Sequence, residues 1–195
     1  MNAIVAKLQE VTSEDEAQRL AYLTDRLELK DSYAGEHTAA VSRLAVAIAT
    51  RLGLGPEKRR RIALGALLHD VGKLTIPDRI LMKPGPLNEL EWAAMRRHAA
   101  FGEQLLVHVL DLPDVIAVVR SHHERWDGDG YPDRLEGEGI PFAARIVAVA
   151  DAFQAMVEPR PYRPPRSREA AIDEITGEAG RQFDPACVEA LLAVV

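Results

Sequence analysis

The stretch PEKRRRIALGALLHDVGK, residues 56–73, predicts a helix over about 56–69 that is buried on one face. Pro56 suits the first helical turn, and Gly72 is placed to end the helix. The basic residues share one face, and the apolar residues expected to face the core are Ile62, Leu64, Leu67 and Leu68. Helical periodicity also dominates the rest of the chain, whereas the alternation typical of half-buried strands never persists beyond a few residues. The sequence therefore predicts an all-α fold.

Helix caps and breakers divide the rest of the chain into further helices. A long helix is expected over about 13–52, with a capping box formed by Ser13 and Glu16 and a break near Gly35 as an option. Residues 74–86 are rich in proline and predict a loop. The later helices are expected over about 88–109, 113–125 and 141–157, with two shorter ones starting at Ser167 and Asp184.

Composition limits the classes of protein to consider. A chain of 195 residues, 47% of them hydrophobic, can bury one sizeable core, so we expect a single domain over residues 1–195. The net charge of -6 and a pI near 5.5 argue against binding to a nucleic-acid polymer or an anionic membrane. Cys187 is the only cysteine, and no signal peptide or membrane-spanning run is evident, which predicts a cytoplasmic protein.

Two positions carry polar residues that packing does not require. His69 and Asp70 directly follow an apolar helical run, and Asp151 interrupts the apolar stretch RIVAVADAFQAM. A buried carboxylate without a partner costs on the order of several kcal/mol, so a metal ion, a cation or a hydrogen-bond network is expected. Taken alone, Asp151 could equally be the salt-bridge partner of Arg145 or Lys73.

A metal centre explains these residues together with the other histidines. Neighbouring helical residues point about 100° apart, so His69 and Asp70 fit two ions more easily than one, with Asp70 as the bridge. Imidazole and carboxylate ligands suit iron, manganese, zinc or cobalt, and the lone Cys187 excludes thiolate chemistry. Any single histidine is more often an ordinary core or surface residue, and His108 is assigned to that class. The candidate ligands are His37, His69, Asp70, His98, His122, His123 and Asp151.

The motifs resemble one family closely, the HD-GYP subgroup of the HD phosphohydrolases. Besides His37 and His98, those that carry the resemblance are HDVGK (residues 69–73), HHERWDGDGYP (122–132) and RPYR (160–163), with KPGPL (83–87) and FDP (183–185) fitting as well. The motif-bearing core covers about residues 31–163, followed by C-terminal helices over 167–195.

The resemblance implies a bacterial signalling enzyme. Its fold would be a helical bundle, and its activity the metal-dependent hydrolysis of cyclic di-GMP to linear pGpG, with GMP as a further product. The seven candidate ligands would hold two divalent transition-metal ions, iron or manganese. Some family members add a third metal through a glutamate four residues before the first histidine, where this chain has Tyr33. Two ions are therefore expected rather than three.

The resemblance also implies roles for residues around the metals. Asp70 and Lys73 are the catalytic candidates, and Lys73 would stabilise phosphate oxygens or protonate the leaving group. Lys73, Arg160 and Arg163 would contact substrate phosphates. Tyr131 would stack on a base or contact a signalling protein through the loop Gly130, Tyr131 and Pro132, with a purely structural role equally open. Apart from the resemblance, the position of Glu124 and Arg125 next to His122 and His123 leaves two interpretations open, support of the ligands or a solvated ion pair.

Two departures from the family pattern leave alternatives open. Gln154 stands where family members commonly have aspartate, and MVEP (residues 156–159) replaces a small hydroxylated turn. A missing carboxylate behind a metal ligand can lower metal affinity or rate by roughly 10- to 100-fold. The alternatives are a catalytically weak module that binds a cyclic dinucleotide or a partner protein, and a phosphohydrolase for another nucleotide such as a hybrid cyclic dinucleotide.

Overall fold

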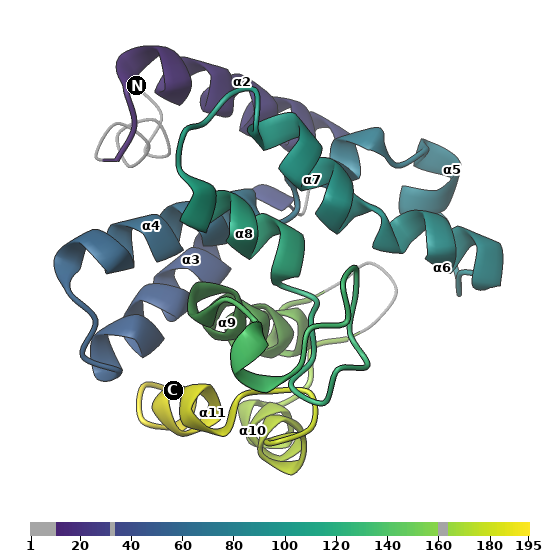
Figure 1. Cartoon of the computed structure of the whole chain (residues 1–195). Helices are drawn as coiled ribbons and strands as arrows, with labels where there is room; N and C mark the ends of the chain where they lie inside the picture. The colour runs from purple at the N-terminus through teal and green to yellow at the C-terminus, as the bar shows by residue number, and fades with distance from the viewer. Residues whose placement is uncertain (1–10, 32–33, 160–163) are drawn as a thin grey trace.

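The computed structural model of the protein describes residues 11–31, 34–159 and 164–195, and these residues form helices and no sheet (Figure 1). The all-α prediction is therefore confirmed. The α-helices are α2 (Glu14–Lys30), α3 (Ala34–Arg51), α4 (Pro56–Leu68), α5 (Asp78–Leu81), α6 (Glu89–Arg96), α7 (His98–Leu106), α8 (Pro113–Ser121), α9 (Phe142–Val157), α10 (Arg168–Gly177) and α11 (Pro185–Leu192), with the 3-10 helices η1 (Val71–Thr75) and η2 (Gly137–Gly139).

The predicted helix starts are confirmed by their caps. The Ser13 hydroxyl accepts the backbone N–H of Glu16 while the Glu16 carboxylate accepts the N–H of Ser13, which is a complete capping box. Asn88 forms a second capping box with Glu91 at the start of α6. The side chains of Ser167 and Asp184 cap α10 and α11.

Several helices are shorter than the sequence predicts. The long helix expected over 13–52 is two helices, α2 and α3, so the break offered as an option near Gly35 is present. The helix expected over 88–109 is divided between α6 and α7 at Arg97. The helix expected to reach residue 125 ends at Ser121. At the ends of α6 and α8, the imidazole of His98 or His122 donates a hydrogen bond to a backbone carbonyl of the last turn. The loop expected over 74–86 contains the short helix α5.

The sequence predicts that Gly72 ends α4, and this prediction is wrong, because the helix already stops at Leu68. Its role is to let η1 approach α7 closely. A Cβ atom on Gly72 would lie 1.9 Å from the carbonyl oxygen of His98 and 2.5 Å from the amide nitrogen of Gly102. Only glycine allows this backbone contact, which holds the segment after Asp70 against the start of α7.

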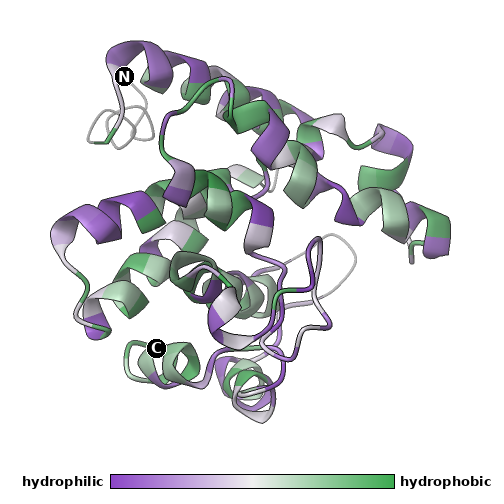
Figure 2. Ribbon diagram, in the orientation of Figure 1, coloured by the Kyte–Doolittle hydropathy of each residue, from purple (hydrophilic) through white to green (hydrophobic). Residues whose placement is uncertain are grey.

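Two apolar clusters hold the fold together, and α4 and α8 contribute to both. Ile62 and Val118 belong to the cluster formed with α3, α9, α10 and α11. Leu64 and Val119 belong to the cluster formed with α2 and the end of α7. Figure 2 shows the hydrophobic sides of the helices turned toward one another. Because α4 and α8 are buried on two sides, the residues at their C-terminal ends are fixed inside the molecule.

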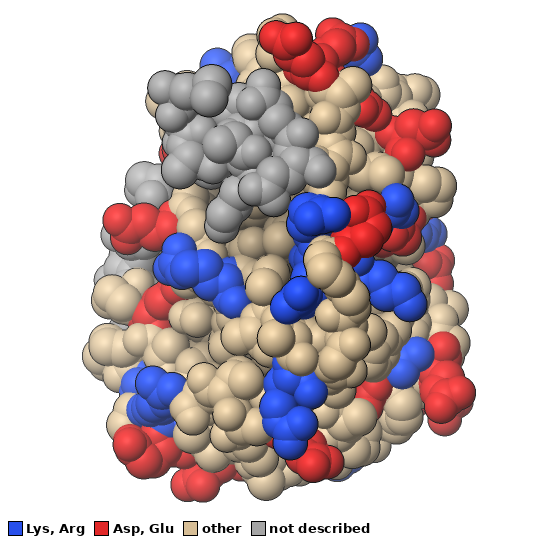
Figure 3. Space-filling view, turned by 90° about the vertical axis from the view of Figure 1, so that its left-hand side faces the viewer, with Lys and Arg blue, Asp and Glu red and all other residues tan. Residues whose placement is uncertain are grey.

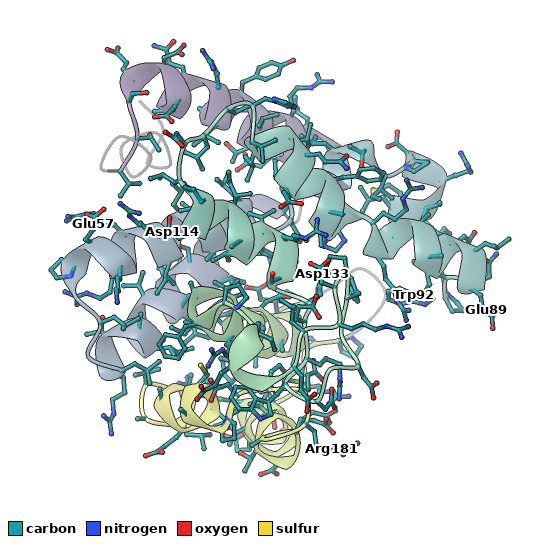
Figure 4. All side chains as sticks on the ribbon, viewed as in Figure 1. Glu57, Glu89, Trp92, Asp114, Asp133 and Arg181 are labelled. Carbon is teal, nitrogen blue, oxygen red and sulfur yellow. The ribbon has the colours of Figure 1, made fainter. Side chains whose placement is uncertain are left out.

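The first and last described helices lie on opposite sides of the molecule. In Figure 1, α2 lies along the top and α10 and α11 lie at the bottom, where they contact α9. No helix in the described part of the chain is long and apolar enough to span a bilayer. On the face shown in Figure 3, basic and acidic side chains are interspersed. On α4, for example, Arg61 pairs with both Glu57 and Asp114, which Figure 4 shows at the same edge of the molecule.

Candidate metal centre

Three helices end where the candidate ligands gather. α4 ends at Leu68, so His69 is its C-terminal cap, and α8 ends at Ser121, so His122 is its cap. The third helix is α6, which ends at Arg96, two residues before His98 begins α7. A helix C-terminus carries partial negative charge and favours cations. The convergence of these ends therefore favours a positively charged occupant.

The same helix ends determine which imidazole nitrogen carries a proton. Three Nδ1–H groups donate to carbonyl oxygens three residues earlier, each at 2.8 Å: His69 to Ala66, His98 to Met95 and His122 to Val119. These carbonyls lie in the last turns of α4, α6 and α8, where backbone acceptors lack a partner within the helix. Because a carbonyl can only accept, Nδ1 must be the protonated nitrogen in a neutral ring. In its neutral form, each ring then carries the lone pair on Nε2.

These lone pairs fit a metal ion. Nε2 of His69 is buried and has no hydrogen-bond partner among the described residues. Nε2 of His98 and Nε2 of His122 are 3.3 Å apart, so two acceptors face each other. Two imidazole nitrogens bound to one ion at about 2.1 Å are separated by roughly 3.0 to 3.4 Å for bond angles from 90° to tetrahedral. A bound cation would satisfy acceptors that the protein leaves without a donor.

The candidate ligands form two groups that share Asp70. In each group the ligand atoms all lie within 4.8 Å of one another. The first group is Asp70, His98, His122 and His123, and the second is His37, His69 and Asp70. Oδ1 of Asp70 is 3.5 Å from Nε2 of His98, whereas Oδ2 is 3.4 Å from Nε2 of His69. The two carboxylate oxygens of Asp70 therefore face different groups.

Asp151 joins the second group from α9. Its Oδ1 atom is 2.9 Å from Nε2 of His37 and 4.0 Å from Nε2 of His69. On the other side of the His37 ring, Nδ1 is 2.7 Å from Oε2 of Glu158. Glu158 is not among the ligands or supporting residues that the sequence predicts. Its spacing of seven residues from Asp151, which places both on one side of α9, was the signal that could have identified it.

Burial keeps three of the imidazoles neutral. Burial lowers the pKa of His98, holds that of His122 well below its usual range and lowers that of His123 to about 3. A neutral imidazole is the form that binds a metal ion. His69 differs because the charges of Asp70 and Asp151 outweigh its burial and raise its pKa to about 9. A metal ion at His69 must therefore displace a proton.

Lys73 is the cation next to the shared carboxylate. Its Nζ lies 2.6 Å from Oδ2 of Asp70, and its side chain is 24% exposed. Burial opposes the charge of Asp70, but the neighbouring ammonium of Lys73 and the imidazole of His69 hold the pKa of this carboxyl well below its usual range. Burial likewise opposes the charge of Lys73, and Asp70 more than compensates by raising the pKa of the amine. Lys73 is thus a charged group at the wall of the site.

The loop after α8 places Tyr131 against the ligands. The Tyr131 ring stacks on His123 with ring centroids 4.8 Å apart, and the guanidinium of Arg96 lies 5.7 Å from the centre of the same ring. Glu124 holds this loop because its buried carboxylate accepts the backbone N–H groups of Asp133 and Leu135 at 2.7 and 3.1 Å. The role of Glu124 is therefore to shape the loop.

Two further residues of this loop are placed outside the ligand groups. Arg125 pairs with Asp127, which is not a candidate ligand, and its guanidinium also donates to Gln182. Gly130 is required here because a Cβ atom would lie 2.4 Å from the amide nitrogen of Arg125.

The structure brings all seven predicted ligands and Lys73 to one place. Arg160 and Arg163, the predicted phosphate contacts, lie outside the described residues, as does Tyr33. Arg145 pairs with Asp184 at 3.0 Å, so the alternative that paired Arg145 with Asp151 is wrong. His108 is exposed after the end of α7, away from the groups above, as the sequence indicates.

Comparison with known proteins identifies relatives across nearly the whole chain. The family model described as HD domain matches residues 21–187. The cyclic di-GMP phosphodiesterase response regulator RpfG of Xanthomonas campestris is 42% identical over 193 residues, which cover 97% of this chain and 50% of that protein. The 3'3'-cGAMP-specific phosphodiesterase 2 of Vibrio cholerae is 38% identical over 181 residues, covering 90% of this chain and 34% of that protein. The chain thus spans half or less of the length of these relatives.

Solved structures share the fold. Bd1817, described as a HDG"Y"P protein from Bdellovibrio bacteriovorus, superposes with a TM-score of 0.69 at 24% identity. The superposition covers 84% of this chain and 53% of that one. At this level of identity the similarity concerns the arrangement of helices, which positions the candidate ligands.

Proposed function

The chain belongs to the HD domain family, in its HD-GYP subgroup, and we propose from this premise that it is a metal-dependent phosphodiesterase that hydrolyses cyclic di-GMP to linear pGpG. GMP is a further product if the linear dinucleotide is cleaved again. The observation that carries the proposal is the set of buried Nε2 lone pairs around Asp70, whose two oxygens face two groups of ligands. We propose one ion in each group, iron or manganese, with Asp70 shared.

Metal ions bound to these ligands would supply Lewis-acid chemistry, activating water and neutralising phosphate charge. The protein's own part is to hold the phosphodiester and the protons. The hydrogen bonds to helix-end carbonyls fix the orientation of His69, His98 and His122. Lys73 presents its ammonium beside Asp70, where it can donate to a phosphate oxygen and stabilise the charge that develops in the transition state. Donation of a proton to the leaving oxygen is the second role open to the same Nζ atom.

Substrate binding would use groups around the rim of the centre. Tyr131, stacked on His123 beside Arg96, offers an aromatic edge at which a purine base can pack. Arg160 and Arg163 are proposed to bind phosphate oxygens, because a guanidinium matches the geometry of a phosphate with two parallel hydrogen bonds. Such contacts are needed because the chain carries a net charge of -6 and would repel a dianionic ligand without local positive charge.

Turnover by the purified chain tests this function. After anaerobic loading with Fe²⁺ or Mn²⁺, cyclic di-GMP should be converted to pGpG, and chromatography of the products would show it. Treatment with a chelator should abolish the reaction, and reloading should restore it. A chain that binds metal and cyclic di-GMP but gives no product would instead be a catalytically weak signalling module. That is the alternative suggested by Gln154, which stands where family members commonly have aspartate.

Hybrid cyclic dinucleotides are the second candidate substrates. The relative from Vibrio cholerae that is named a 3'3'-cGAMP-specific phosphodiesterase is 38% identical to this chain, close to the 42% of the cyclic di-GMP enzyme RpfG. Overall identity therefore discriminates poorly between the two substrates. A competition assay with equal concentrations of cyclic di-GMP and 3'3'-cGAMP would rank them by kcat/KM.

Location and protein partners are part of the same proposal. A cytoplasmic enzyme would meet its nucleotide substrate there, and the single buried Cys187 suits a reducing compartment. A signalling partner at the loop Gly130, Tyr131 and Pro132 stays a prediction.

A further inference from the structure

We propose that Glu158 is a positioning residue for His37: by accepting the Nδ1–H of His37, Glu158 aims Nε2 of that ring at the metal site. The proposal rests on the proposed function only in treating His37 as a metal ligand. It assigns a role in the metal centre to a residue that lies outside both ligand groups.

The contacts are short and largely shielded from water. Oε2 of Glu158 is 2.7 Å from Nδ1 of His37, and Oδ1 of Asp151 is 2.9 Å from Nε2. The side chains of His37 and Glu158 are 11% and 26% exposed. The two nitrogens of the His37 imidazole therefore each contact a carboxylate, Asp151 in α9 or Glu158 at its C-terminal cap. These two residues are seven positions apart, or about two helical turns.

His37 needs a side-chain partner because of its place in the fold. His69, His98 and His122 each bond a carbonyl in the last turn of a helix, where that acceptor is otherwise unused. His37 instead lies in the first turn of α3, where the carbonyl three residues earlier belongs to Ala34 and is directed into the helix. A free backbone acceptor is not within its own helix, so a carboxylate from another helix takes its place.

Glu158 stands where its side chain can turn back toward α3. It is the C-terminal cap of α9, with extended backbone angles (φ -86°, ψ 143°), and its N–H donates to the carbonyl of Gln154 at 3.0 Å. Gln154 lies on the same side of α9, between Asp151 and Glu158, and its side chain forms no hydrogen bond within the described part of the chain. Of Asp151, Gln154 and Glu158, it is Glu158 that contacts Nδ1 of His37. A carboxylate that accepts from a ligating imidazole orients the ring and raises its basicity.

Metal affinity measured by chelator competition with Mn²⁺ tests the role. We expect Glu158→Leu to weaken the binding of one Mn²⁺ by roughly 10- to 100-fold and to leave the other unchanged. Glu158→Gln keeps an acceptor oxygen of the same reach, so it should recover most of the lost affinity. Glu189, exposed on α11, provides the matched controls Glu189→Leu and Glu189→Gln, which should bind both ions like the original chain.

The outcomes are separable from the activity. Affinities in Glu158→Leu within twofold of the original values would overturn the role, as would a loss in Glu158→Gln as large as that in Glu158→Leu. Thermal unfolding of the metal-free variants identifies a loss of fold, in which case the isosteric Glu158→Gln alone decides through its expected near-original affinity. If the original chain binds Mn²⁺ but hydrolyses no cyclic dinucleotide, the proposed function fails while the role of Glu158 stands.

Discussion

Asp70 and Lys73 are neighbours in space but have different parts in the centre. Asp70 contributes an oxygen to each ligand group, whereas Lys73 contacts only Asp70 among the ligands. We predict that Asp70→Ala loses metal and activity together. Lys73→Ala should keep the metal and lower kcat about 10- to 150-fold, since a hydrogen bond to a charged group is worth about 1.5–3 kcal/mol. Metal content and steady-state kinetics of both variants check this, and metal loss in Lys73→Ala would refute the assignment.

A second ion pair at the residue scale predicts a pH dependence of stability. Arg120 donates to both oxygens of Asp133 at 2.7 Å, and Figure 4 shows Asp133 near the end of α8. The hydrogen bonds from Arg120 lower the pKa of Asp133. Its ionised form therefore stabilises the fold above the ordinary carboxyl pKa of about 3.9, and this contribution is lost as the pH falls through the lowered value.

The substitution Asp133→Asn isolates that contribution. Both side chains are about a third exposed, so solvent screens the pair and the expected loss at pH 7 is about 0.5–1 kcal/mol. Urea unfolding of the metal-free proteins should show this difference at pH 7 and a smaller one near pH 3. Asp129→Asn in the same loop is the control. A difference that stays constant over this pH range would contradict the ion-pair origin.

At the scale of elements, the packing of η1 on α7 makes Gly72 critical. We predict that Gly72→Ala destabilises the protein by about 1–3 kcal/mol or more and weakens metal binding, because the added Cβ would collide with the backbone of α7 at His98. Gly177→Ala is the control, since a Cβ there meets nothing within 4 Å. Denaturant unfolding and metal titration of the two variants provide the measurement. Equal stability of the two variants would show that η1 can shift away from α7.

The same elements show what the sequence could predict. Caps such as Ser13 and Asn88 act within a few residues, so their helix starts are readable from local sequence. The ends of α6 and α8 depend on imidazoles that bond backbone carbonyls beside a site assembled from distant helices. Periodicity continues through both breaks, so it predicts helices that are too long. A tertiary contact has overridden the local pattern.

The site itself was predictable in part for a similar reason. Histidines and carboxylates in apolar surroundings stand out in the sequence, because burying them requires a partner. Glu158 stands out less, since a glutamate near a helix end is an ordinary surface residue and only its spacing of seven residues from Asp151 sets it apart. Its role depends on the approach of α3 to α9, which only the folded chain reveals.

At the scale of the whole molecule, the fold brings the ends of α4 and α8 together at the candidate metal centre. Two apolar clusters fix α4 and α8 on both sides, and both helices stop at a histidine that faces the centre. α3 and α9 contribute His37 and Asp151 to the second ligand group. Candidate ligands from α3, α7, α9 and the ends of α4 and α8 thus meet at one place, which explains why the motif residues are scattered along the chain.

The number of metal ions per chain tests this arrangement most directly. After anaerobic loading with Mn²⁺ or Fe²⁺ and removal of free metal, elemental analysis should find two ions per original chain, one for each ligand group, and none in Asp70→Ala. A single ion, three tightly held ions, or none in the original chain would contradict a centre of two groups sharing Asp70.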